Sequence, residues 1–197
     1  MKTIKSKILV IAFMFITLIG YAKSEINFNN AVSVLDAKKV KVEFKDVKLG
    51  DKLVIRNEEN VELHSEQISQ KGDFSKIFDL SSLENGKYSI ELHKDFEIIV
   101  ESFLIDDNQV MYSEDSEKVI FKPIVRNEEN LILISKISFD KEPLMVSLYY
   151  NNDLIYSETV TGDTILNRVY KLNKELKGDY RVVLYSNDKS YIHNFKI

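Results

Sequence analysis

Several residue types are scarce or missing in this chain. It has no cysteine, no tryptophan, six glycines, two prolines and three histidines. Without cysteine the chain forms no disulfide, offers no thiolate for catalysis, and cannot carry the lipid anchor of a bacterial lipoprotein. The few glycines include no phosphate-binding loop, and no Gly-x-Ser-x-Gly element is present. We therefore expect a protein that is not an enzyme and that holds no cofactor.

Residues 1–24 have the organisation of a secretory signal peptide. Three lysines near the start precede the uncharged apolar run Ile8–Gly20. A helix that spans a bilayer needs about 20 apolar residues, so this run is too short to serve well as an uncleaved anchor. Cleavage is expected after Ala22 or Ser24. The sequence thus predicts export to the periplasm, the cell surface or the medium, with no membrane span in the mature chain.

The charge of the mature chain limits its partners. Residues 1–24 hold four lysines and no acid, which leaves 23 basic and 31 acidic side chains after cleavage. The resulting net charge of about −8 opposes binding to nucleic acid and to anionic lipid, since both need a basic footprint. The composition favours a protein partner at the cell envelope.

The second half of the sequence repeats the first at a distance of 92 residues. Nine identities fall in an ungapped stretch of 46 positions, and apolar character agrees between them. Such agreement indicates two copies of one module. The identical pairs are Asn60 and Asn152, Ser65 and Ser157, Glu66 and Glu158, Leu80 and Leu172, Gly86 and Gly178, Tyr88 and Tyr180, Leu92 and Leu184, Phe103 and Phe195, and Ile105 and Ile197.

Short segments of alternating polar and apolar residues follow the signal peptide, and no helical periodicity is found there. Alternation over 87–93 is typical of a half-buried strand. The continuous apolar run Leu131–Ile134 predicts a strand buried on both faces. Asn151–Asp153 predicts a hairpin loop, and Pro123 indicates an edge or a bulge. The predicted strands lie near 31–35, 39–46, 52–56, 61–69, 74–79, 87–93, 97–105, 118–125, 131–139, 144–150, 154–161, 164–171, 179–186 and 189–197.

Seven strands per copy, with turns every 8–12 residues, favour an all-β fold of two tandem immunoglobulin-like β-sandwich modules. The first module is expected at 25–105 and the second at 118–197. The polar and acidic segment 106–117 is interpreted as a linker between them.

Three segments of the first module carry a resemblance to a known family: Lys52–Ile55, Phe78–Leu92 and Phe103–Ile105. They resemble the C-terminal sorting domain of type IX secretion substrates and related small secreted β-sandwiches of Bacteroidetes-type bacteria. The second module is similar through Glu175–Tyr180 and Asn194–Ile197. The resemblance implies a β-sandwich with an L-x-x-G-x-Y corner and, as one function, recognition by the type IX export machinery.

A glycine followed by a tyrosine two residues later marks the same corner in each module. Gly86 and Gly178 permit a turn that a Cβ atom would strain. Tyr88 and Tyr180 are expected to bury their rings and to return their hydroxyl groups to nearby backbone. We interpret all four residues as structural.

Three groups of side chains are candidates for ligand binding. Tyr149, Tyr150, Tyr156 and Tyr170 could form an aromatic platform for a sugar or peptide, although Tyr149 and Tyr150 must point to opposite faces of their strand. Asp106, Asp107 and Asp115 offer oxygen ligands for calcium but lack the spacing of a calcium loop. Glu62, His64 and Glu66 alternate and would share one strand face, which could hold zinc but is more typical of a solvated face.

These observations predict a non-catalytic extracytoplasmic interaction or structural protein. Edge-strand pairing or docking of a sandwich face would provide its binding mechanism. A sorting-type domain recognised by the export machinery and a small carbohydrate- or peptide-binding protein are the alternatives.

Overall fold

Fifteen β-strands in four antiparallel sheets make up the described chain, which contains no helix. The computed structural model describes residues 31–197, apart from the side chains of residues 113–115. The predicted signal peptide, residues 1–24, lies outside the described residues. No helix within 31–197 is long and apolar enough to cross a membrane. The prediction of an all-β fold is confirmed.

The first eight strands form one pair of sheets, which we call the first unit. Its small sheet has the order β1-β2-β5 and its large sheet the order β4-β3-β6-β7-β8. The strands are β1 (Val32–Asp36), β2 (Lys39–Val47), β3 (Lys52–Asn57), β4 (Glu62–Gln67), β5 (Gly72–Asp79), β6 (Gly86–His93), β7 (Glu97–Asp106) and β8 (Gln109–Phe121).

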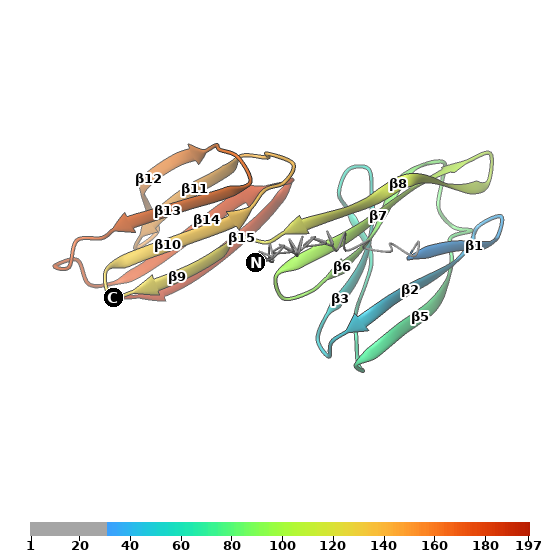
Figure 1. The fold of residues 1–197 in the computed structure, drawn as a ribbon, viewed down its shortest axis with the longest axis horizontal. Helices are drawn as coiled ribbons and strands as arrows, with labels where there is room; N and C mark the ends of the chain where they lie inside the picture. The colour runs from blue at the N-terminus through green and yellow to red at the C-terminus, as the bar shows by residue number, and fades with distance from the viewer. Residues whose placement is uncertain (1–30) are drawn as a thin grey trace, which may run out of the picture.

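The remaining seven strands form the second unit, which lies beside the first along the long axis of the molecule (Figure 1). Its sheets have the orders β13-β10-β9 and β12-β11-β14-β15. The strands are β9 (Ile124–Glu128), β10 (Leu131–Ile137), β11 (Leu144–Tyr150), β12 (Asp153–Val160), β13 (Ile165–Lys171), β14 (Asp179–Ser186) and β15 (Lys189–Lys196).

Strands β1–β7 and β9–β15 follow the same topology. Each strand of the first series has the same sheet neighbours as its counterpart in the second, and β8 is the additional strand, paired to β7. The 92-residue shift seen in the sequence carries Val40, paired with Phe78, onto Ile132, paired with Tyr170. The repeat is therefore a repeat of strand order and register, and not only of composition.

Each unit encloses its own cluster of buried side chains between its two sheets. The repeated leucines Leu92 and Leu184 are both fully buried, one in each cluster. Asn151 and Asn152 turn the β11–β12 hairpin with positive φ angles, as their side chains predict.

The segment 106–117, interpreted from the sequence as a linker, is not one. Asp107 and Asn108 both have positive φ and form the tight turn of the β7–β8 hairpin, after which β8 runs along β7. Val110 is buried in the first cluster and Tyr112 packs against it. The segment is therefore a strand with alternating apolar residues, although its acidic residues are typical of a linker. The chain passes between the units at Lys122 and Pro123, inside the strand predicted at 118–125.

Candidate functional site

Six aliphatic side chains lie on the outer face of the small sheet in the second unit, among polar residues. Strand β10 turns Ile132 and Ile134 into the core, and its alternate residues therefore point to the opposite face of the sheet. There Leu133 pairs with Val169 and Ile137 with Ile165, across β10 and β13. We call the following six residues the apolar face: Ile124, Leu131, Leu133, Ile137, Ile165 and Val169.

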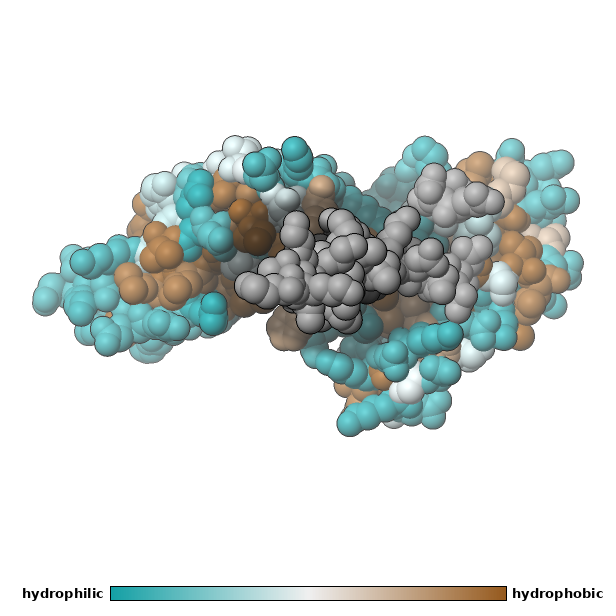
Figure 2. All heavy atoms as spheres, viewed as in Figure 1, coloured by the Kyte–Doolittle hydropathy of each residue, from teal (hydrophilic) through white to brown (hydrophobic). Residues whose placement is uncertain are grey.

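The apolar face is open to solvent. Ile165 is 60% exposed and Val169 63% exposed, while Leu131 and Leu133 are half-buried. Apolar side chains gather over β10 and β13 in the space-filling view (Figure 2). The sequence-based prediction that 131–134 is buried on both faces is thus wrong: the run is apolar on both faces, but within the described chain only one face is covered by a second sheet.

The same face of the first unit is charged. Leu131, Leu133 and Ile137 correspond to lysines on β2, and Ile165 corresponds to an aspartate on β5. Val169 keeps an exposed apolar counterpart, Ile77, which is 58% exposed, and Ile124 corresponds to the buried Val32. The charged counterparts are Lys39, Lys41, Lys45 and Asp73. Because the two faces share one topology, the fold itself does not require the aliphatic residues.

The border of the apolar face is polar at one end and aromatic at the other. Leu131 pairs with Glu128 on one side and with Lys171 on the other. Near the first unit, Phe139 is 71% exposed and its ring meets that of Phe121 edge to face, with 5.7 Å between centroids. Polar side chains also cross the middle of this face, because Ser135 pairs with Asn167 between the pairs Leu133–Val169 and Ile137–Ile165. Arg126 pairs with Leu133 on the other side of β10. Protein–protein contact surfaces commonly combine apolar and polar residues.

The four tyrosines proposed as an aromatic platform are divided among three places. Tyr149 lies on the outer sheet face, where the Arg181 guanidinium sits 4.6 Å from its ring centroid. Tyr150 packs on the core instead, with its ring 5.0 Å from that of Tyr180. Tyr156 and Tyr170 meet at 5.6 Å across the edges of β12 and β13. The structure does not bring the four together.

The Tyr156–Tyr170 pair closes one side of the second unit. The Tyr170 hydroxyl donates to Glu158 Oε1 at 2.6 Å, and Arg168 Nε lies 3.3 Å from the same oxygen. Burial, together with the Glu158 carboxylate, raises the pKa of Tyr170 well above its usual value. These contacts tie the two sheets of the second unit together.

The glycine–tyrosine corners have the same geometry in both units. Gly86 and Gly178 have φ angles of 155° and 156°. The Tyr88 hydroxyl donates to the Glu84 carbonyl at 3.0 Å and the Tyr180 hydroxyl to the Leu176 carbonyl at 2.9 Å. Each hydroxyl therefore satisfies a backbone carbonyl four residues earlier.

The two metal hypotheses find no support in the described residues, among which no group of three or more His, Cys, Asp or Glu side chains could hold a metal. Asp106 and Asp107 flank the β7–β8 turn, and the side chain of Asp115 lies outside the described part. A β-bulge separates the pairs Ile55–His64 and Arg56–Glu62, so Glu62 does not share a face with His64. The expectation of one shared face is wrong because the sequence does not reveal the bulge.

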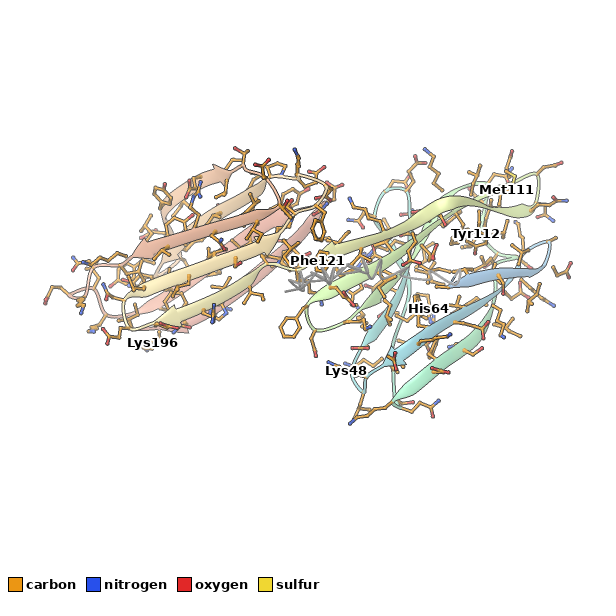
Figure 3. The ribbon with its side chains drawn as sticks, in the orientation of Figure 1. Lys48, His64, Met111, Tyr112, Phe121 and Lys196 are labelled. Atoms are coloured by element: carbon orange, nitrogen blue, oxygen red, sulfur yellow. The ribbon has the colours of Figure 1, made fainter. Side chains whose placement is uncertain are left out.

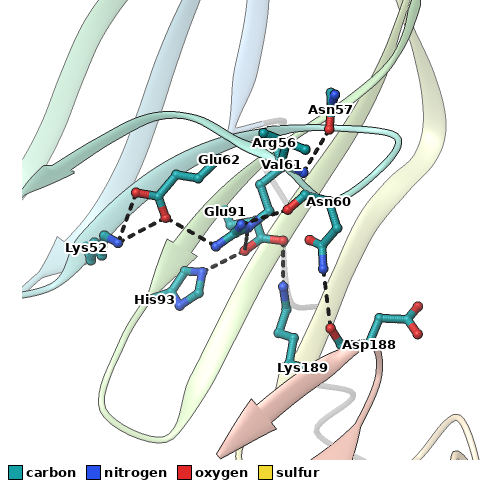
Figure 4. Close-up of polar contacts among 10 residues, drawn as sticks. All are labelled: Lys52, Arg56, Asn57, Asn60, Val61, Glu62, Glu91, His93, Asp188 and Lys189. Carbon is teal, nitrogen blue, oxygen red and sulfur yellow. Dashed lines mark hydrogen bonds and ion pairs between the residues drawn. The ribbon is translucent and has the colours of Figure 1, made fainter.

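A buried carboxylate joins the two units. Glu91, on β6, accepts hydrogen bonds from Lys189 of the second unit at 2.7 Å and contacts His93 Nε2 at 2.6 Å (Figure 4). Arg56 Nε lies 3.4 Å away. Burial alone would raise the pKa of Glu91, but the bonds to His93 and Lys189 outweigh it and lower the pKa to about 2.

Two further contacts accompany this ion pair. Asn60 Nδ2 donates to the Asp188 carbonyl at 3.3 Å, and Lys118 of β8 lies 3.1 Å from Asp140. A cavity of about 790 Å³ lies between the units, and its lining includes Glu91, Lys118 and Lys189. Lys189 is bound to Glu91, and Lys118 to Asp140, so these charged groups hold the two sides of the cavity together.

Comparison with known proteins adds little. No family model matches the sequence, and no curated protein does. Similar solved structures include the BSP domain of a biofilm-associated protein, at 13% identity and a TM-score of 0.29 over 82% of this chain and 27% of that chain. The human OSCAR ligand-binding domain matches at 8% identity and a TM-score of 0.24, over 81% of this chain and 89% of that one. The chain thus spans about a quarter of the first of these proteins.

Proposed function

We propose that this is an exported, non-catalytic protein of the cell envelope, built of two immunoglobulin-like sandwiches, that binds another protein through the apolar face. One observation carries the proposal: six aliphatic side chains stand on an open sheet face whose counterpart in the first unit is charged. Exposed apolar side chains that gather on one face of a protein commonly mark an interaction site. The two corners and the shared strand order support the immunoglobulin-like description.

The chemistry of the apolar face favours a protein over a sugar or a lipid. All six members are leucine, isoleucine or valine, so the apolar face itself has no aromatic ring for a sugar to stack on. The acidic balance of the mature chain opposes an anionic membrane. A flat aliphatic surface on another protein fits best, because burying an exposed leucine, isoleucine or valine stabilises a complex by about 1–2 kcal/mol per side chain.

A photo-crosslinking experiment in the native envelope tests this function. A benzoylphenylalanine placed at Val169 should yield a crosslink to one defined protein, and the same substitution at Ile77, the equivalent position of the first unit, serves as the matched control. The second substitution Ile165→Lys should abolish the crosslink from Val169. Both tested residues are exposed, so neither change should alter folding.

Equal crosslinking from Val169 and Ile77, or a crosslink that survives Ile165→Lys, would refute binding through the apolar face. A crosslink only to a second copy of this chain would make the face a site of self-association and would also contradict a distinct partner.

The resemblance to type IX sorting domains stays a prediction about export. It is tested separately, by deleting residues 124–197 and following secretion of the first unit. Continued export of the remainder would rule out a sorting role for the second unit and would leave the binding proposal untouched.

A further inference from the structure

We infer that strand β15 is a second binding site, which accepts an extended, acidic strand from another protein. The site is the edge of β15 that faces away from β14. In the first unit, β8 covers the same edge of the equivalent strand, β7. Within residues 31–197, β15 pairs only with β14. The β7–β8 pair of the first unit is therefore the template for the complex that we infer for β15.

The backbone of β15 has hydrogen-bonding groups directed toward this edge. Gly178 and Ile197 exchange both of their backbone hydrogen bonds, at 3.0 and 3.2 Å. The β14–β15 register continues from this pair without a bulge. In an antiparallel pair, alternate residues bond to the partner strand and the others point away from it. Four N–H and C=O pairs consequently face outward, those of Ser190, Ile192, Asn194 and Lys196.

Two core residues next to this edge are incompletely covered. Phe103 and Ile105 of the first unit are 4% and 0% exposed, whereas the identical residues Phe195 and Ile197 are only half-buried. The difference arises where β8 lies against β7. The Tyr112 ring of β8 packs 5.7 Å from that of Phe103.

Strand β8 shows which side chains such a cover needs. Val110 pairs with Ile105 and Tyr112 with Phe103, two residues apart along β8. Both lie against the first core. Tyr112 is at the end of the unit far from the junction (Figure 3). A strand with apolar residues at this spacing would bury Phe195 and Ile197 in the same manner.

The charges along β15 define the partner further. Residues 189–197 contain His193, Lys189 and Lys196 and no acidic side chain, while β8 is acidic. Lys189 is bound to Glu91, and Lys196 lies 3.8 Å from Asp179, which leaves His193 as the group that faces an incoming strand. In the first unit, Glu117 of β8 lies opposite Glu101, which is a pair of like charges. His193 occupies the position of Glu101 in the second unit, so an incoming glutamate would meet an imidazole there. Pairing of β15 with itself would instead bring basic side chains together.

A synthetic peptide with the sequence of residues 109–121 is the probe for this site. Amide hydrogen exchange of the full exported protein should show at least tenfold slower exchange at Ser190, Ile192, Asn194 and Lys196 when the peptide is present. Amide exchange along β7 should be the same with and without the peptide. Strand β8 belongs to the same chain, so its effective concentration at this edge is high and the peptide does not displace it. A peptide of the same composition in scrambled order serves as the control.

Two variants at one position separate main-chain pairing from side-chain contact. Ile192→Pro removes an outward N–H, which an edge strand tolerates, and should weaken binding of the peptide at least tenfold. Ile192→Ala keeps the N–H and should bind within twofold of the parent. A Glu117→Lys peptide should bind at least threefold more weakly, because its lysine would face His193.

The exchange measurement on the unaltered protein needs no variant and decides the matter even if Ile192→Pro is unstable. Three results would each overturn the inference. The peptide could leave exchange at the four β15 amides unchanged, or it could protect only β7. Ile192→Pro and Ile192→Ala could also lose binding equally. The apolar face lies on the other sheet, so its variants and these report on different sites.

Discussion

The two units share one strand order but present different surfaces to their surroundings. The outer face of the small sheet is charged in the first unit and aliphatic in the second, through replacements such as Lys41 by Leu133. The edge of the large sheet is covered by β8 in the first unit, whereas in the described chain β15 has no neighbour on that side. The first unit thus has a charged face where the second has an aliphatic one, and a covered edge where β15 has no hydrogen-bonded strand within the described residues.

This difference separates what the fold requires from what it does not. Positions that agree between the units, such as Leu92 and Leu184 or Tyr88 and Tyr180, lie in the cores and corners. Positions that disagree lie on the outer face and at the edge. Since a second example of the same fold does without the aliphatic face, the requirements of the fold do not account for it.

The tyrosine corners should give the largest effects and reveal whether the two units depend on them equally. Tyr180 is 4% exposed and Tyr88 is half-buried, so Tyr180→Ala leaves the larger cavity. We expect Tyr180→Ala to destabilise the second unit by about 4 kcal/mol and Tyr88→Ala the first by about 3 kcal/mol. Exchange of the buried amides of Val182 and Ile90 reports on each unit separately. Equal losses, or a melting curve like that of the parent, would contradict the comparison.

The corner glycines should rank next. A Cβ atom at Gly178 would lie 2.9 Å from the Tyr150 ring, whereas at Gly86 the nearest atom, on the Tyr88 ring, is 3.8 Å away. Both residues have positive φ, which alone costs about 1 kcal/mol for alanine. Gly178→Ala should therefore cost about 2–3 kcal/mol and Gly86→Ala about 1 kcal/mol, measured by urea unfolding. If Gly86→Ala cost more stability than Gly178→Ala, the ring of Tyr150 would have to move aside freely.

Sequence periodicity was sufficient to place most strands of both units. The alternation of Tyr88, Ile90 and Leu92 identifies β6, and the ungapped repeat then locates β14. Alternation can be recognised in a single sequence because one face of each strand must be buried. The asparagines of the β11–β12 loop and the glycines of the corners were equally readable, since few other residues tolerate their backbone angles.

The two proposed sites could not be predicted in the same way. The acidic residues of 106–117 resemble a linker, and only Val110 and Tyr112 reveal β8. The run Leu131–Ile134 shows that both faces of β10 are apolar, but periodicity cannot say which faces another sheet covers. Pairing partners and bulges depend on contacts between distant segments, which one sequence does not specify.

The junction between the units should respond to acid. The folded pKa of Glu91 is about 2, below its usual 4.5, so its stabilising contribution is complete above pH 4.5 and is lost as the pH falls toward 2. Lys189→Met should weaken the contact by about 1–2 kcal/mol at pH 7 and have little effect near pH 2. Lys174→Met, which removes an exposed pair with Glu129 inside the second unit, is the control. Small-angle scattering of the parent protein should show the two units separating as the pH falls. An unchanged scattering profile at pH 3 would contradict a role for Glu91 in holding the two units together.

The β7–β8 pair should show the smallest effect and the opposite pH dependence. Burial, and then the neighbouring Glu101, raises the pKa of Glu117 to about 7, so pairing is favoured below pH 4.5 and loses stability as the pH rises through 7. Glu117→Gln should therefore stabilise the first unit by roughly 1 kcal/mol at pH 8 and change nothing at pH 4.

Exchange of the Ile90 amide measures the stability of the first unit, and that of Val182 should not respond to Glu117→Gln. A stabilisation that persists at pH 4 would mean that Glu101 and Glu117 do not repel each other. An acidic partner strand would then have no electrostatic preference for β15, because a glutamate would be no better placed opposite His193 of β15 than opposite Glu101 of β7.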